Sequence, residues 1–419
     1  MSELGTLQST LTSARPRAVA ALLRYFRDLD LAEEAFQDAC LRALRSWPEN
    51  GPPRDPAAWL IMVGRNAALD SVRRNARLRP LEAGEGHDLG TPAEAAEADL
   101  VERLDDSHYR DDVLRLLFIC CHPELPATQQ IALALRIVSG LSVAQIARAF
   151  VVGESAMEQR ITRAKAKVAA AGLPFATPDA GERSDRLAAV ATMLQLVFNE
   201  GYSAAAEPER AQLADEGIRL MRLLLRMFPS EPELMGLLAN MLLQHARRDA
   251  RFDAAGEVIL LEDQDRRRWD PRAIREGLAL LDKAMLHRAP GPYQVQAAIA
   301  ALHARAETAA DTDWAQIDRL YATLEHLRPS PIVTLNRAVA VSKVEGPEVA
   351  LRMVEPLSER LGSYFYFHGL RGGLLLQLGR PHEAREAFDR AISLATTAAE
   401  AAHIRMHLDR LSEASSTRA

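Results

Sequence analysis

The sequence predicts an all-α protein built from several helical domains. Ala, Leu and Arg dominate the 419 residues and aromatic residues make up only 5%, a composition that favours helix packing over sheets. Runs with the period-two alternation of strands are nearly absent, and proline or glycine recurs between segments of helical length. At this length we expect about two to four domains, with ample apolar material for their cores.

Two helices are expected at the start of the chain, over 15–28 and 31–46. The break between them is polar, and Asp30 and Glu33 have the spacing of a capping box. In such a box each side chain bonds to the backbone N–H of the other residue, which fixes the first turn of a helix. We therefore expect the second helix to start just after Asp30.

A loop and a third helix are expected next. Residues 47–54 contain three prolines and one glycine, which predicts a loop. Asp55 and Pro56 then supply an N-cap and a proline at the first helical position, a strong start signal. The third helix is expected over 55–79, with a regular pattern that continues through Arg74.

Charged residues are concentrated in patches. The net charge of −6 argues against non-specific DNA binding by the molecule as a whole. There are five Arg and one acidic residue over 59–80, and five basic and two acidic residues over 141–170. Over 81–112, by contrast, there are two Arg and eleven acidic residues. Any contact with nucleic acid is therefore expected to be local to the two basic segments.

A helix-turn-helix is expected in the second basic segment. After an acidic linker over 80–98 and an apolar stretch over 113–121, helices are expected over 127–139, 142–151 and 155–170. The last two starts have capping-box spacing, Ser142 with Gln145 and Ser155 with Glu158, and Gly153 supplies the turn between them. Apolar residues at helical spacing form the expected seam between the two helices: Ile146, Ala147, Phe150, Met157, Ile161 and Val168.

The second helix of this pair has the side chains of a DNA-reading helix. On or near its exposed side lie Gln159, Arg160, Thr162, Arg163 and Lys165. Arg and Gln can pair with base edges in the major groove, and Lys can pair with phosphate. The alternative is a plain helical hairpin with a solvated charged face, which the basic second helix and the paired capping boxes make less favoured.

The helix over 55–79 offers a second candidate surface. Asn66, Asp70 and Arg73 share one stripe, on which Asn66 can pair with a base edge. Arginines suited to phosphate lie beside it: Arg65, Arg73, Arg74 and Arg77. Asp70 would repel phosphate, so we expect it to position a neighbouring Arg. A solvated charged face is an equally good reading of this helix alone.

The end of the chain contains a repeat. Ala338, Ala350, Val354 and Leu357 recur 34 residues later as Gly372, Ala384, Phe388 and Ala391. Small residues at these offsets let two helices pack closely, and 34 residues is the length of a tetratricopeptide repeat. Over 186–330 the repeat is degraded, so only the helical pattern predicts a similar array there.

No residue cluster predicts catalysis, a cofactor or a resident metal. Three cysteines are typical of a reducing cytosol, and no signal peptide or membrane-spanning run occurs. Adjacent helical residues diverge by about 100°, so Cys120, Cys121 and His122 are expected to pack rather than to bind metal. The charged segment 261–269 could hold an oxygen-ligated metal, but a charge-paired loop that fixes helices or docks a partner is favoured.

Two parts of the N-terminal half resemble a known family. Residues 32–47, residues 56–70 and the pair Arg73-Arg74 resemble region 2 of the extracytoplasmic-function sigma factors of bacterial RNA polymerase, and residues 113–170 resemble their region 4. Segments further on resemble a subgroup with a tetratricopeptide-like C-terminal extension: Phe198-Asn199-Glu200-Gly201-Tyr202, Leu261-Glu262-Asp263-Gln264-Asp265-Arg266, Trp269 and Leu335-Asn336-Arg337-Ala338-Val339-Ala340.

The resemblance implies an organisation into domains. Sigma region 2 would occupy 1–79 and an acidic linker 80–99. Region 4 with its helix-turn-helix would occupy 100–174, and a tetratricopeptide-like helical domain 186–413. The linker in this family runs toward the RNA exit path, so its acids would fill a basic channel there; a solvated tether is the equally weighted alternative.

The resemblance also implies site residues. The polymerase-binding residues would be Glu34, Gln37 and Asp38. The −10 element would be contacted by Trp47, Arg65, Asn66, Asp70, Arg73 and Arg74, with the loop near Trp47 holding an unstacked base. The −35 element would be contacted by Ser155, Gln159, Arg160, Thr162, Arg163 and Lys165.

The function implied is that of a cytoplasmic sigma factor, not itself an enzyme and without a cofactor. It would bind core RNA polymerase through the β′ clamp helices and the β flap and direct it to promoter DNA. The C-terminal helices would regulate this activity or dock a protein partner. The alternative is a helix-turn-helix regulator with a tetratricopeptide-like sensor domain that never enters polymerase; the segment 33–74 argues against it, because such a regulator has no use for it.

Overall fold

The chain folds as an all-α protein, as its sequence predicts. A computed structural model describes residues 3–78, 106–150, 152–171, 180–203, 208–253 and 258–395, with 401, 404, 405 and 408. Among these residues the only strand-like pairing is an isolated antiparallel bridge between Phe252 and Val258. The described residues divide into two compact units, the first within 1–201 and 215–220 and the second within 202–214 and 221–419.

The first unit begins with three mutually packed helices. They are α1 (Glu3–Phe26), α2 (Leu29–Asn50) and α3 (Pro56–Leu78). The third starts as predicted, because the Asp55 carboxylate accepts a hydrogen bond from the N–H of Ala58 at 3.0 Å. Gly64 lets α3 approach α2, since a Cβ there would lie 2.7 Å from the carbonyl oxygen of Ala35.

The predicted start and end of the second helix are both wrong. The N-cap is Asp28, whose side chain accepts from the N–H of Leu31 at 2.9 Å. Glu33 is therefore not half of a capping box; it is buried and points to other partners. At the other end the helix continues through Pro48 to Asn50 and stops at Gly51, which has a φ of 73°. The loop is thus shorter than the predicted 47–54.

The rest of the first unit contains the predicted helix-turn-helix. Its elements are α5 (Asp106–Cys120), α6 (Ala127–Ala134), the π-helical turn η1 (Leu135–Ser139), α7 (Val143–Ala149), α8 (Glu154–Ala170) and most of α9 (Ala180–Ser203). The helix predicted over 127–139 is therefore α in its first part and π in its last turn. The linker 80–99 lies outside the described residues.

Of the two capping boxes predicted in the helix-turn-helix, one is present. The hydroxyl of Ser142 accepts from the N–H of Gln145 at 3.1 Å, and the Gln145 amide oxygen accepts from the N–H of Ser142 at 2.8 Å. The second box is wrong, because α8 starts one residue earlier than predicted, with Gly153 as its N-cap and no side-chain bond. Ser155 thus lies within the first turn of α8.

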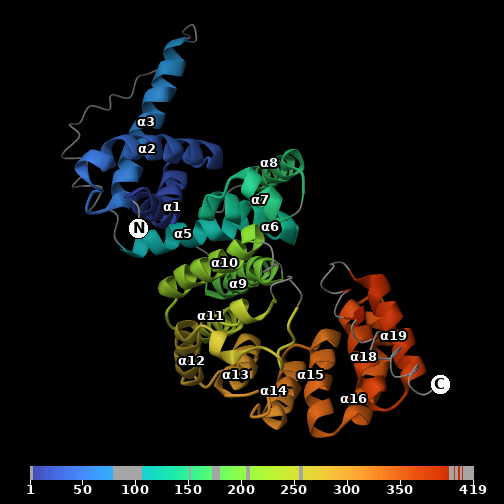
Figure 1. The fold of residues 1–419 in the computed structure, drawn as a ribbon. Helices are drawn as coiled ribbons and strands as arrows, with labels where there is room; N and C mark the ends of the chain where they lie inside the picture. Colours follow the sequence, from blue (N-terminus) through green and yellow to red (C-terminus); the bar gives the residue numbers. More distant parts are fainter. Residues whose placement is uncertain are drawn as a thin grey trace. The chain divides into compact units, whose positions relative to one another are not determined.

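The second unit is a succession of packed helices (Figure 1). They are most of α10 (Pro208–Met227), whose residues 215–220 belong to the first unit, then α11 (Pro232–His245), α12 (Pro271–Met285), α13 (Pro292–Arg305), α14 (Trp314–Leu327), α15 (Pro331–Val344), α16 (Pro347–Val354), α17 (Ser358–Leu361), α18 (Phe365–Gln377) and α19 (Pro381–Leu394), with short 3-10 turns at Arg248–Ala250, Arg266–Arg268 and Glu355–Leu357. Proline opens most of these helices, where its missing N–H costs no hydrogen bond.

The 34-residue repeat corresponds to two packed helix pairs, α15 with α16 and α18 with α19. Ala338 and Ala350 are fully buried where the first pair meets. In the second pair a Cβ on Gly372 would lie 2.6 Å from the ring of Phe388. Small residues therefore hold each pair at close distance, as the repeat predicts.

Candidate functional site

The exposed face of α8 carries most of the residues predicted to contact the −35 element. The seam against α7 is buried through Ile146, Ala147, Met157, Ile161 and Val168, with Phe150 partly buried. This packing leaves four predicted side chains exposed and Arg160 partly buried; the exposed ones are Ser155, Gln159, Thr162 and Arg163. An uncovered, basic helix face of this kind can enter a major groove.

Lys165 is the exception on α8. Its Nζ lies 2.6 Å from Oδ1 of Asp30 and 2.7 Å from Oε2 of Glu33, both on α2. Burial opposes the charge of the ammonium, but the hydrogen bonds to Asp30 and Glu33 outweigh it and raise the pKa of Lys165. Within the first unit, therefore, a residue predicted to contact DNA is paired with the neighbouring helical domain.

Glu33 is the centre of this contact, and three cations surround it. Besides Lys165, the guanidinium of Arg15 donates to Glu33 at 3.1 Å and that of Arg136 lies 3.5 Å away. The Glu33 and Arg15 side chains are 5% and 9% exposed, so these charges sit in a region of low dielectric. We call Arg15, Glu33, Arg136 and Lys165 the Glu33 cluster.

Arg15 also ties α1 to the π-helical turn. It donates to the carbonyl oxygens of Ile137 at 3.0 Å and Arg136 at 3.2 Å, which belong to the last turn before Gly140. Such terminal carbonyls have no partner within their own helix. A Cβ on Gly140, which has a φ of 76°, would lie 2.7 Å from the Arg15 side chain. The turn is thus built to admit the guanidinium.

Five of the six −10 candidates lie on α3, with different exposures. Asn66 is exposed, and Arg65 is partly buried with its guanidinium 5.7 Å from the ring centroid of Tyr25. The backbone of Asp70, Arg73 and Arg74 belongs to α3, but their side chains lie outside the described residues. Gly51 and Pro52 are also exposed, and they lie in the loop just before the start of α3.

Trp47 lies in the core rather than in a loop. Its side chain is 4% exposed, and its ring meets that of Trp59 edge to face at 5.3 Å. The sequence suggested a loop because Pro48 interrupts helical hydrogen bonding. The helix nevertheless continues, since this keeps the Trp47 ring buried and lets Gly51 close the last turn onto the Trp47 carbonyl at 2.8 Å. To hold a base, Trp47 would have to leave this packing.

The polymerase-binding candidates share one exposed face of α2. Glu34, Gln37 and Asp38 are all exposed. The same face continues with Leu41 and Leu44, which are 55% and 45% exposed and which sequence reasoning missed. Their signal was available, because large apolar residues followed the acidic ones at helical spacing. Exposed leucines beside acidic groups are typical of a protein-docking surface.

The cysteine and charged-loop motifs have packing roles. Cys120 and Cys121 are buried, and burial raises the pKa of Cys121 to about 12. Lys343 pairs with Glu262 at 2.9 Å, and Arg266 donates to the backbone carbonyls of His303 and Ala306. The segment 261–269 thus fixes neighbouring helices, as favoured from the sequence.

In the part of the chain that the structure describes, no three His, Cys, Asp or Glu side chains gather as metal ligands. No helix there has the length and hydropathy to cross a bilayer.

Comparison with known families gives three matches along the chain. Residues 11–78 match "Sigma-70 region 2" and residues 115–168 match "Sigma-70, region 4". Residues 186–285 match a family of unknown function, DUF6596. The first two ranges contain α2, the exposed α3 residues, and all of α7 with most of α8.

Similar proteins were also found across the whole length. "Uncharacterized protein R00370" of Rhizobium meliloti (strain 1021) is 69% identical over 98% of this chain and 97% of its own. Yeast Tom70 superposes with a TM-score of 0.38 at 14% identity, over 99% of this chain and 87% of its own. The TPR domain of P58(IPK) superposes with a TM-score of 0.24 at 13% identity, over 91% of this chain and 99% of its own.

Proposed function

We propose that this chain, which belongs to the sigma-70 family and carries its regions 2 and 4 ahead of a helical C-terminal array, binds core RNA polymerase and directs it to promoters. The observation that carries the proposal is the presence of both regions, in order, on one chain. A regulator that binds DNA alone has no use for region 2. The protein would act in the cytoplasm as the specificity subunit of an enzyme, not as an enzyme.

Binding to core polymerase would use the exposed face of α2. Glu34, Gln37 and Asp38 would pair with cationic groups of the β′ clamp helices, and the exposed Leu41 and Leu44 would be covered by the same contact. Charged groups at such an interface set orientation and association rate, and the leucines supply buried apolar area. Region 4 would bind the β flap of core polymerase, as in the family.

Promoter contact would use α3 and α8. Arg65, Asn66, Asp70, Arg73 and Arg74 would meet the −10 element, with Trp47 joining only if its ring leaves the core. Ser155, Gln159, Arg160, Thr162 and Arg163 would enter the major groove of the −35 element, and Lys165 would pair with phosphate. Because Lys165 is paired with Asp30 and Glu33 in this conformation, its contact with DNA requires α8 to separate from α2.

The decisive experiment is a pull-down with purified core polymerase followed by transcription from promoters enriched after overexpression. We expect stoichiometric binding and promoter-specific transcripts. Absence of binding would sink the sigma proposal and favour the regulator that acts outside polymerase. A matched protein with region 4 removed distinguishes binding through region 2 from binding through both regions.

We further propose that the C-terminal helices regulate this activity. The test compares the full chain with two truncations, one ending near 175 and one after Ser203. The second keeps α9, whose Arg186 lies 5.4 Å from the ring of Phe118 in the first unit. If the longer truncation transcribes identically to the full chain, in vitro and in cells, the regulatory role is wrong.

A further inference from the structure

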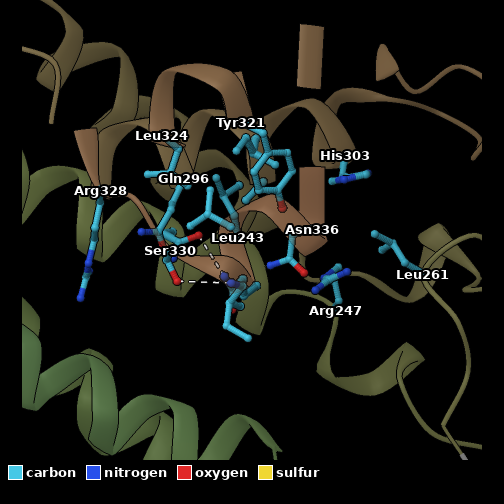
Figure 2. A pocket seen from close by; sticks show the side chains of 16 residues that line it. Leu243, Arg247, Leu261, Gln296, His303, Tyr321, Leu324, Arg328, Ser330 and Asn336 are labelled. Carbon is cyan, nitrogen blue, oxygen red and sulfur yellow. Dashed lines mark hydrogen bonds between the residues drawn. The ribbon is translucent and has the colours of Figure 1, made fainter. Parts of the chain in front are cut away.

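The second unit contains a cavity of about 430 Å³ between α11, α13, α14 and α15 (Figure 2). This volume falls within the range of about 300–1,000 Å³ typical of small-molecule sites. Apolar side chains from all four helices contribute to its lining: Leu243, Ile299, Leu324, Ile332 and Val333. No step of promoter recognition uses this cavity.

The polar residues of the lining include cationic and neutral groups but no anionic group. Arg247 and Arg328 bring positive charge, and no Asp or Glu is among the lining residues. The remaining polar groups are mainly carboxamides, from Asn240, Gln244, Gln296 and Asn336. Such a lining offers donors and cations but no carboxylate to balance them, so it is complementary to an anion.

Three polar groups converge on one part of the cavity. Figure 2 shows the hydroxyl of Tyr321, the amide of Asn336 and the guanidinium of Arg247 directed toward a common space. Within the described chain, the Tyr321 and Asn336 side chains have no hydrogen-bond partner, and Arg247 has no carboxylate partner. Arg247 is instead positioned by Tyr202, to whose hydroxyl it donates, and by the ring of Trp269.

The pKa of His303 indicates the electrostatic environment near Arg247 in the cavity. Its Nδ1 is buried and has no hydrogen-bond partner among the described residues. Burial, together with the positive charges of Arg247 and Arg266, lowers the pKa of His303 to about 4. The side chain is therefore neutral at ordinary pH, so the positive charge on this side of the cavity comes from the arginines and not from His303.

We propose that this cavity binds a small organic anion with an apolar body. A carboxylate, sulfonate or phosphate group would accept hydrogen bonds from Arg247, Tyr321 and Asn336, while the body packs on Leu243 and Leu324. Inorganic anions are excluded as preferred ligands, because they would leave the apolar side chains of the lining uncovered. The convergence of charge excludes neutral apolar compounds as preferred ligands, because they leave Arg247 without its anion.

The test uses the full-length chain and two fluorescent probes of similar shape. 8-Anilino-1-naphthalenesulfonate is anionic, and N-phenyl-1-naphthylamine is neutral. We expect saturable binding of the sulfonate, weakened about tenfold by Arg247→Gln and weakened less by Tyr321→Phe, whereas neither change weakens the neutral probe. Arg275→Gln, on the exposed surface of α12, is the matched control and leaves both probes unchanged.

Two further measurements keep the outcome decisive if Arg247→Gln disturbs the fold. Ala300→Phe fills the cavity and is expected to abolish binding of the sulfonate while circular dichroism remains that of the wild type. Saturation with the sulfonate is expected to raise the pKa of His303, measured by NMR. The proposal is wrong if Ala300→Phe binds the sulfonate as the wild type does, or if Arg247→Gln and Tyr321→Phe leave its affinity unchanged. Because no assay involves polymerase, these results stand apart from those for the sigma proposal.

Discussion

At the scale of single residues, Glu33 has the most consequential environment in the first unit. One buried carboxylate accepts from Arg15 and Lys165 and lies beside Arg136. Removing one member of a buried charge cluster leaves the others desolvated without compensation, which costs far more than loss of a surface pair. Glu33 is therefore expected to dominate the stability of the contact between α2 and α8.

A pair of substitutions tests how much Glu33 contributes to the free energy of unfolding. Glu33→Gln is expected to lower the free energy of unfolding of the first unit by about 3 kcal/mol, because three cations lose their anion. Asp30→Asn is the control: its side chain is 76% exposed and shares Lys165, so the expected loss is below about 1 kcal/mol. Thermal and urea unfolding of the chain ending after Ser203 measure both, and equal losses would contradict the central role of Glu33.

His303 gives a residue-scale prediction for pH. Its folded-state pKa is about 4, below the ordinary value of 6.5, so the unfolded state binds the proton first as pH falls. The contribution of neutral His303 to the free energy of unfolding is fully present above about pH 6.5, and it is lost progressively as the pH falls toward 4. Relative to His303→Gln, the wild type is expected to lose roughly 1 kcal/mol by about pH 5, after allowance for partial exposure. A difference in melting temperature that does not change with pH would contradict this.

At the scale of elements, local sequence predicts some helix starts and misses others. Ser142 and Gln145 form their capping box, whereas α2 and α8 both start before the residues whose spacing predicted a box. Proline opens α11, α12 and α13, at positions where it separates segments of helical length in the sequence. The end of α2 was predicted wrongly, because the decisive contact is tertiary: burial of Trp47 against Trp59 carries the helix through Pro48.

The two serines of the helix-turn-helix provide a matched test. Ser142→Ala removes a cap that holds the first turn of α7 and is expected to cost about 1 kcal/mol of stability. Ser155→Ala removes no cap, since α8 begins at Glu154 after Gly153, and the expected change is within about 0.5 kcal/mol. Urea unfolding of the chain ending after Ser203 distinguishes them; similar losses would show that the second box forms in solution.

Adjacent glycines in α18 test the packing of the repeat. Gly372→Ala would place a Cβ 2.6 Å from the buried Phe388 ring and is expected to destabilise the second unit by about 1–3 kcal/mol. Gly373 has open space at the same point, so Gly373→Ala is expected to stabilise α18 by about 0.5–1 kcal/mol. Opposite shifts in the unfolding midpoint of the full chain are the expected result, and shifts of the same sign would refute the packing.

At the scale of the whole molecule, the class of fold and the two sigma regions could be predicted from the sequence, but the contacts between distant segments could not. Helical periodicity correctly predicted that Gln159, Thr162 and Arg163 of α8 are exposed. The partners of Lys165 could not be predicted, because Asp30 and Glu33 lie more than a hundred residues away and no local pattern records the pairing. The cavity could not be predicted for the same reason, because its lining includes residues from four different helices.

The proposed complex with core polymerase gives a prediction at this scale. Leu41→Ser combined with Leu44→Ser is expected to weaken binding to core polymerase at least about tenfold, because the exposed apolar face of α2 is lost. Stability is expected to change little, since both side chains already meet water. Leu286→Ser, at a leucine that is 80% exposed after α12, is the control and leaves binding unchanged. Binding is measured by fluorescence anisotropy with labelled protein.

The Glu33 cluster has a consequence for exchanging domains between proteins of this kind. Regions 2 and 4 are often treated as modules that recognise separate DNA elements, so that a new promoter preference could be engineered by grafting one of them. In this chain Glu33 of one region balances Arg136 and Lys165 of the other. A chimera that replaced residues 106–171 with a segment lacking these two cations would leave Glu33 with Arg15 alone, so a successful graft has to transfer both sides of the cluster together.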